Sequence, residues 1–170
     1  NYEEQTRVIV ERESDVNTRY VSALTAYRAA VSVRESLEEK LDDIQTYKNN
    51  ALFLEKLRDV STLYSSVSAS SVDLSGSHEI DSSALKIVSD RKKMISSKTK
   101  ELHDVMTDIS NQKYTKEGLL SGDILDKWFN ALLEESRAKA ELEVLDATLK
   151  SIVDDYVRFS PIGTDLNREN

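Results

Sequence analysis

Glycine and proline are scarce in this chain, and their scarcity restricts its fold more than any other feature. The only proline is Pro161, and the four glycines are Gly76, Gly118, Gly122 and Gly163. Proline removes an amide donor and clashes inside a helix, and glycine costs about 1 kcal/mol there relative to alanine. Since neither residue occurs in the first 75 positions, we expect long helices, which offer repeated surface but few enclosed pockets.

Apolar residues recur every three or four positions over residues 2–67, which is the period of one helix face. The stripe consists of Val16, Tyr20, Leu24, Tyr27, Val31, Leu37, Leu41, Ile44, Tyr47, Ala51, Leu54 and Leu57. A single helix over this range would be about 100 Å long at about 1.5 Å per residue. Such a helix cannot pack on itself, so we expect a partner along its length.

Two further segments carry the same pattern. Over residues 84–112 an apolar residue returns every seven positions, at Val88, Ile95, Leu102 and Ile109. Over residues 123–159 the spacing is typical of a coiled coil. We predict that this third segment supplies the structural residues Leu142, Leu145, Leu149, Ile152, Tyr156 and Phe159.

Three breaks separate or end these segments. Nine of the nineteen residues 65–83 are serine, which competes with helical hydrogen bonds, so a tip loop is predicted at about 68–83. Gly118 and Gly122 mark a second break at 113–123. Pro161 forces Ser160 out of the helical region, and with Gly163 it predicts a turn after Phe159, so both count among the structural residues.

These elements predict an all-α fold, an elongated antiparallel coiled-coil hairpin. One long helix at about 2–67 would pack against two helices in series, at about 84–112 and 123–159. We expect residues 1–170 to form one helical fragment of a larger protein, because the chain begins at Asn1 without a methionine.

Charge and composition exclude several classes of partner. The formal net charge is −8, and no basic stripe of the kind that binds phosphates is visible, which argues against nucleic acid. The chain has no cysteine, so disulfides and thiolate metal sites are excluded. No apolar run reaches the length of about 18–20 residues that spans a bilayer, so any membrane contact would come through parts outside this fragment.

Candidate catalytic and metal-binding residues are few. Glu101 and His103 are two positions apart, whereas helical di-metal sites need Glu and His three apart, so we interpret His103 as a surface residue and His78 as solvated. We interpret four acidic pairs as solvated helix faces: Glu38–Glu39, Asp42–Asp43, Glu134–Glu135 and Asp154–Asp155. We therefore expect no catalytic, cofactor or metal site, and no enzymatic activity.

Two contacts are predicted for the third segment. Trp128 and Phe129 form an aromatic pair at its start, which we interpret as a core plug, with a contact to a neighbouring subunit as the alternative. Glu135 and Lys139 are four residues apart in the order that favours an ion pair on a helix.

The end of the third segment resembles a known family. Residues 137–146 (RAKAELEVLD) and 156–169 (YVRFSPIGTDLNRE) are similar to the helical region of the polysaccharide co-polymerase superfamily, the chain-length determinants and exopolysaccharide export proteins of the Wzc and GumC types. The family pattern of aromatic helix end, Ser-Pro-Ile-Gly turn and Leu-x-Arg-x-Glu restart corresponds to Phe159, 160–163 and 166–169. Weaker similarity extends over 1–8, 47–54 and 131–134.

The resemblance implies a non-catalytic periplasmic module of a bacterial inner-membrane protein. Such a protein has a transmembrane helix at each end of its periplasmic domain and organises polymerisation, chain length or export of a surface polysaccharide. Its implied partners are copies of itself, with a polysaccharide polymerase or an outer-membrane export component.

Two other functions stay open at this point. The hairpin of a periplasmic adaptor in a tripartite secretion system also uses long antiparallel heptads with a tip loop. A carboxylate enzyme in a helical bundle would need inward-facing Glu and His residues, which the sequence pattern does not place.

Overall fold

The computed structural model describes residues 1–75, 82–113 and 122–159, and these form helices without strands. The helices are α1 (Tyr2–Glu38), α2 (Ile44–Lys48), α3 (Ala51–Ser75), α4 (Ser82–Lys113) and α5 (Gly122–Phe159). The all-α class predicted from the sequence is confirmed. The predicted turn at Pro161 and Gly163 lies outside the described residues.

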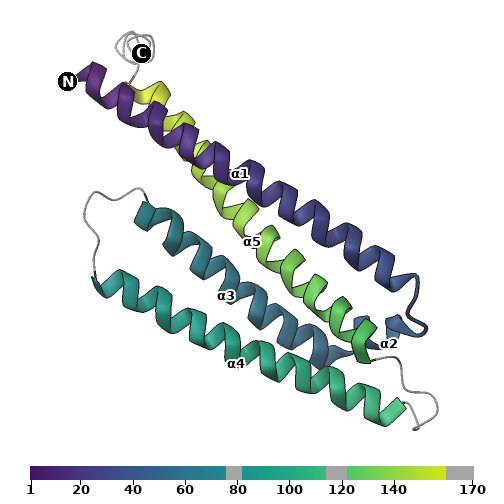
Figure 1. Cartoon of the computed structure of the whole chain (residues 1–170). Helices are drawn as coiled ribbons and strands as arrows, with labels where there is room; N and C mark the ends of the chain where they lie inside the picture. The colour runs from purple at the N-terminus through teal and green to yellow at the C-terminus, as the bar shows by residue number, and fades with distance from the viewer. Residues whose placement is uncertain (76–81, 114–121, 160–170) are drawn as a thin grey trace.

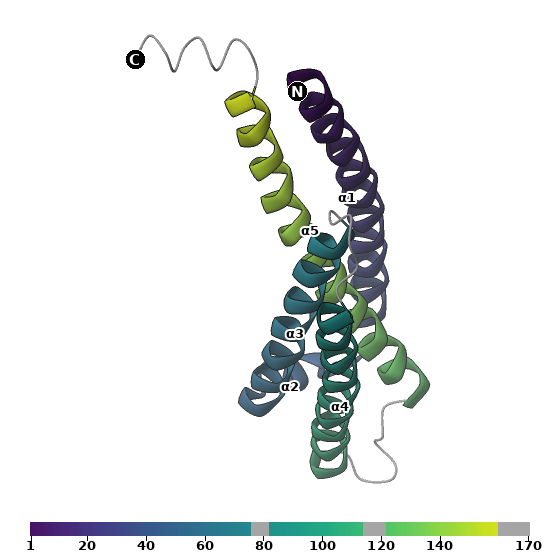
Figure 2. The same ribbon diagram turned by 90° about the vertical axis from the view of Figure 1, so that its left-hand side faces the viewer.

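Antiparallel pairing dominates the architecture (Figure 1). Helix α1 packs along α5, which runs in the opposite direction, and α3 packs in the same way against α4. Helix α3 also contacts α5, so the two pairs form a four-helix body. The start of α1 and the end of α5 continue beyond this body, and they separate from each other toward their ends (Figure 2).

The predicted hairpin pairing is therefore confirmed, but the first helix is not continuous over 2–67. It ends at Glu38, and the chain turns back through α2 into α3. Asp43 has φ 59° and ψ 24°, a left-handed conformation that Asp tolerates better than most residues. The Asn50 side chain then accepts a hydrogen bond from the Phe53 amide (3.0 Å) at the start of α3.

Apolar residues of this turn explain why the chain folds back. Leu41, Ile44 and Tyr47 are buried in a cluster that includes Leu102 of α4 and Trp128 of α5. A continuous helix would carry the same three side chains past α5 instead of placing them between α4 and α5. Burial of each such side chain is worth about 1.5–3 kcal/mol, which outweighs the few helical hydrogen bonds lost at the break.

The predicted tip loop at 68–83 is wrong at 68–75 and 82–83, because α3 continues to Ser75 and α4 begins at Ser82, and the rest of it lies outside the described residues. Tertiary packing overrides the weak helix propensity of serine. Val72 is buried against α1 and α5, and the Ser61 hydroxyl lies 2.6 Å from that of Ser136 on α5. Ser65 also bonds the Ser61 carbonyl (3.2 Å), so its hydroxyl is satisfied within the helix.

The sequence predicts that the two returning helices pack in series along one long helix. The structure shows a different arrangement. Helices α4 and α5 run in opposite directions, α4 packs on α3, and α5 packs on both α1 and α3 (Figure 1). The reason is the break after Glu38, which gives each returning helix its own antiparallel partner. The second predicted break, at 113–123, lies outside the described residues except for Lys113, Gly122 and Asp123, which belong to helices α4 and α5.

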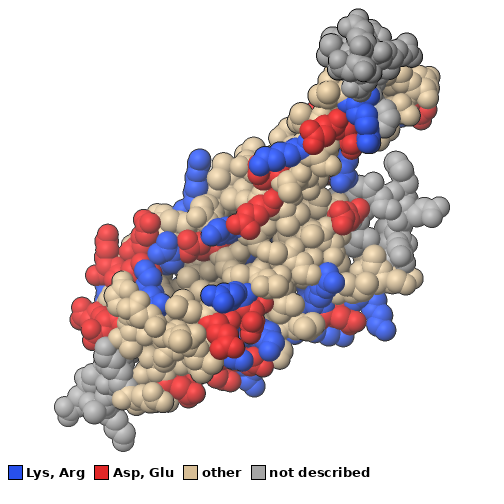
Figure 3. All heavy atoms as spheres, turned by 180° about the vertical axis from the view of Figure 1, so that it is seen from behind, with Lys and Arg blue, Asp and Glu red and all other residues tan. Residues whose placement is uncertain are grey.

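Two apolar clusters form the core. The larger one joins the α2 turn to α3, α4 and α5 and contains Tyr47, Phe53 and Trp128. The smaller one joins α1, α3 and α5 around Val16 and Leu145. Charged residues are absent from 60–72 of α3, and the rear view shows a broad uncharged surface in the middle of the molecule (Figure 3).

Candidate functional site

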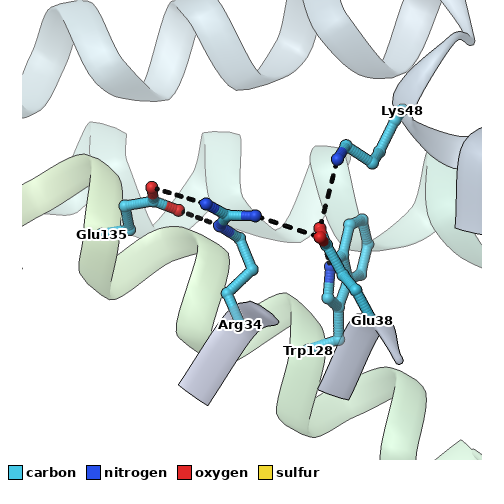
Figure 4. A network of polar contacts seen from close by, with 5 residues as sticks. All are labelled: Arg34, Glu38, Lys48, Trp128 and Glu135. Atoms are coloured by element: carbon cyan, nitrogen blue, oxygen red, sulfur yellow. Dashed lines mark hydrogen bonds and ion pairs between the residues drawn. The ribbon is translucent and has the colours of Figure 1, made fainter. Parts of the chain in front are cut away.

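Three little-exposed charged side chains belong to one polar network, where α1, α2 and α5 meet (Figure 4). Arg34 of α1 makes two contacts with the Glu135 carboxylate of α5, one of them from Nη2 to Oε1 (3.2 Å), and its Nη1 lies 3.1 Å from Glu38 Oε2. Glu38 Oε1 accepts a hydrogen bond from Trp128 Nε1 (3.2 Å) and lies 3.4 Å from Lys48 Nζ. The side chains of Arg34, Glu38 and Glu135 are only 16–17% exposed.

Electrostatics favour the charged forms of Glu38 and Arg34. Burial raises the pKa of Glu38, but the Trp128 hydrogen bond and the Arg34 and Lys48 charges outweigh it, so the pKa lies below its usual value. The hydrogen bond to Glu135 raises the pKa of Arg34, against the effect of its own burial. A proton-transfer group needs a pKa near the working pH, and Glu38 is shifted away from it.

A hollow of about 280 Å³ adjoins the network and is lined by its five side chains with Phe53, Leu54, Leu57 and Leu132. Its two cations and two carboxylates are already paired with one another, so no charge in its wall is left to recognise a ligand. We therefore interpret the network as a clamp that joins α1 and the α2 turn to α5.

Removal of the Glu38 charge should show a pH-dependent loss of stability. Because its pKa is lower in the folded than in the unfolded chain, Glu38 stabilises the fold fully above its usual pKa of about 4.5, and this contribution disappears as the pH falls through the folded value. Urea unfolding of Glu38→Gln should show a loss of about 2 kcal/mol at about pH 7 and a much smaller loss at about pH 3. An equal loss at both pH values would contradict the clamp.

The matched control is Glu11→Gln. Glu11 also pairs with an arginine four residues away, Arg7 (3.3 Å), but both side chains are more than 60% exposed. Exposed pairs of this kind contribute about 0–1 kcal/mol, so this substitution should change the unfolding free energy little at either pH.

An aromatic cluster lies directly beside the clamp. Trp128 is fully buried, with its ring 5.9 Å from that of Phe53 and 6.0 Å from that of Tyr47. The Tyr47 hydroxyl lies 2.7 Å from that of Ser110, which in turn donates to the Met106 carbonyl (3.1 Å). Burial raises the pKa of Tyr47. Trp128 and Phe129 thus lie in the core, which agrees with their interpretation from the sequence as a core plug.

His103, the histidine that the sequence singled out, lies partly exposed between Asp126 and Phe129. His103 Nε2 lies 3.1 Å from Asp126 Oδ1. The centroids of the His103 and Phe129 rings are 5.2 Å apart, and the two rings are nearly perpendicular. The two polar side chains are 43% and 59% exposed. Glu101 turns to Lys98 (3.2 Å) and Lys56 (3.4 Å), so the structure does not bring Glu101 and His103 together. His78 lies outside the described residues.

The predicted structural residues of the third segment differ in burial. Leu145 and Ile152 are buried, and Leu142 and Leu149 are half-buried against the same cluster. Tyr156 is 43% exposed, because α3 and α4 do not reach this part of α5. The side chain of Phe159 is not among those described.

Two of the acidic pairs contain residues of the clamp, which the sequence analysis did not predict. Glu38 and Glu135 belong to the clamp, not to solvated faces, and Glu135 binds Arg34 instead of Lys139. The only sequence signal was the position of Arg34, which interrupts the apolar stripe of the first segment next to Val33. Among the described residues, no three His, Asp or Glu side chains are grouped so that they could hold a metal ion.

Comparisons with known proteins give no relative. No family model, no curated protein and no solved structure matches the chain. Among the described helices, none has an apolar stretch of the length that crosses a bilayer.

Proposed function

We propose that this chain is a non-catalytic structural module whose helices hold and space neighbouring parts of an assembly. The observation that carries the proposal is the clamp, because its charged side chains pair with one another and so join α1 and the α2 turn to α5. The long pairing of α1 with α5 gives the module reach, and its surface hollows are shallow grooves between or along helices.

We further propose that the parent is an inner-membrane protein that organises polymerisation, chain length or export of a surface polysaccharide. The similarity of residues 156–169 to polysaccharide co-polymerases supports this part of the proposal, together with the long antiparallel helices before them. In this setting the module lies in the periplasm, and its partners are copies of itself with a polymerase or an outer-membrane export component.

The test is a substitution in the full-length protein in its own cell. Leu145→Ala removes buried side-chain volume between α1, α3 and α5, and we expect an altered length distribution of the surface polysaccharide on a gel, at unchanged protein level on an immunoblot. Lys139→Gln, on the exposed side of the same helix, should leave the distribution unchanged. A secretion defect with normal polysaccharide would instead indicate the adaptor of a secretion system.

A further inference from the structure

The ends of α1 and α5 extend past the four-helix body and expose apolar side chains. Val72, near the end of α3, packs at the level of Val16, so residues 2–15 and 153–158 lie beyond it (Figure 1). We call these two stretches the protruding end. Six of its large apolar side chains are at least 40% exposed: Tyr2, Val8, Val10, Val153, Tyr156 and Val157.

The protruding end is also acidic. Residues 2–15 contain five acidic and two basic residues, a net charge of −3, and residues 153–158 contain two acidic residues and one basic, a net charge of −1. On α1, Glu4, Glu11 and Asp15 follow one face at helical spacing and are all exposed. Val8 lies on the same face, so apolar and acidic side chains are interleaved there.

The outer face of α4 has the opposite charge. Residues 82–100 contain six basic residues and one acidic residue, a net charge of +5 in a chain of −8. Lys86, Lys93 and Lys100 repeat every seven residues, about 10.5 Å apart along the helix, and all three are exposed. Two large apolar residues, Ile87 and Met94, are also nearly half exposed beside them. We call these five residues the basic face.

The lysines of the basic face differ from the cations of this chain that form ion pairs within one helix. Arg7, Lys127 and Lys150 each pair with a carboxylate one turn away on their own helix. Among the described side chains, no carboxylate lies within ion-pair distance of Lys86, Lys93 or Lys100. Their charge is therefore available to an acidic partner, and the exposed apolar neighbours indicate that the partner is a protein surface.

We propose that the protruding end of one copy of this chain docks on the basic face of a second copy. Both surfaces mix charges of one sign with exposed apolar side chains, and the signs are opposite. Glu4 and Glu11 have the same seven-residue spacing as the lysines, so acidic and basic side chains can alternate in register along two packed helices. The contact is heterologous, so a docked pair still has one free protruding end and one free basic face, to which further copies can bind.

The inference rests on the proposed function in one respect: the proposed assembly brings copies of the chain next to each other. Its test uses the purified chain and sedimentation velocity at low ionic strength, without any polysaccharide. We expect self-association that grows with protein concentration and weakens as salt rises toward about 1 M, where the Debye length is about 3 Å. A chain that stays monomeric over the whole concentration range at low salt would overturn the inference and leave the proposed function standing.

Charge reversal locates the contact. The triple substitution of Lys86, Lys93 and Lys100 by Glu should weaken self-association at least about tenfold, which corresponds to about 1.4 kcal/mol. A control triple lowers the net charge equally through exposed cations elsewhere: Arg28, Lys40 and Lys139, each replaced by Glu. Equal weakening by both triples would mean that only total charge matters, and would overturn the inference.

Mixing two variants gives the decisive result. Replacing Glu4, Glu11 and Asp15 by Lys should weaken self-association to a similar extent, since both surfaces are then basic. The mixture of this variant with the Lys-to-Glu triple should associate again, because each carries the charge that the other requires. Absence of association in the mixture, with both variants folded by circular dichroism, would overturn the proposed contact.

Discussion

Leu145→Asp should unfold the chain or leave it folded only at low temperature. Leu145 is fully buried between Val16 of α1, Val72 of α3 and Ile152 of α5. Loss of a buried leucine side chain costs about 2–5 kcal/mol by itself, and a carboxylate left without a partner in the same place adds a further penalty. Domains of this size are stable by only about 5–15 kcal/mol in total, so the combined loss approaches the whole stability.

The measurement is a thermal melt followed by circular dichroism, with Val153→Asp as the matched control. Val153 lies on the same helix but is 53% exposed, so the same new charge meets water there. Its melting temperature should stay close to that of the wild type at low protein concentration. A wild-type melt for Leu145→Asp would mean that α5 does not present this face to α1 and α3.

Trp128→Ala should have the second large effect. The indole is fully buried against Tyr47 and Phe53, and its Nε1 donates to Glu38. Truncation of a buried aromatic side chain costs about 3–5 kcal/mol, and here it also removes one of the groups that hold the Glu38 charge. Urea unfolding should therefore show a marked fall in the midpoint.

Trp128→Phe separates the two contributions. It keeps much of the packing against Phe53 but removes the Nε1 hydrogen bond to Glu38. We expect a smaller loss than for alanine, together with a pKa for Glu38 that moves back toward its usual value. Equal losses for the two variants would show that the hydrogen bond, not ring packing, dominates at this position.

The sequence predicted the helices well where their apolar stripes were regular. Leu142, Leu145, Leu149 and Ile152 follow the spacing of one helix face, and they do face the neighbouring helices. The stripe around Val16 was equally clear. Regular periodicity fixes which side of a helix is buried, but it does not say which other helix covers it.

The break in the first segment was missed because the apolar stripe continues through it. Leu41, Ile44 and Tyr47 keep the helical spacing, yet Asp43 and Asn50 within the same stretch favour turns and helix caps. Those Asx residues were the signal for the turn. The prediction of a loop in the serine-rich segment failed for the opposite reason, because the packing of Val72 against α1 and α5 outweighs a weak local preference.

The clamp could not be predicted from spacing alone. Arg34 and Glu135 are 101 residues apart, and only the turn after Glu38 brings Lys48 back toward α1. An ion pair of this kind depends on how three helices cross, which the pattern along one helix does not contain.

The unequal helix lengths also give the molecule uneven mechanical stiffness. Four helices share the cross-section over the body, but only α1 and α5 remain in the protruding end (Figure 1). A rod with half the cross-section bends far more easily under the same sideways load. A sideways displacement of the tip would therefore be taken up mostly by bending of the two-helix part, and the four-helix body with its aromatic core would change shape little.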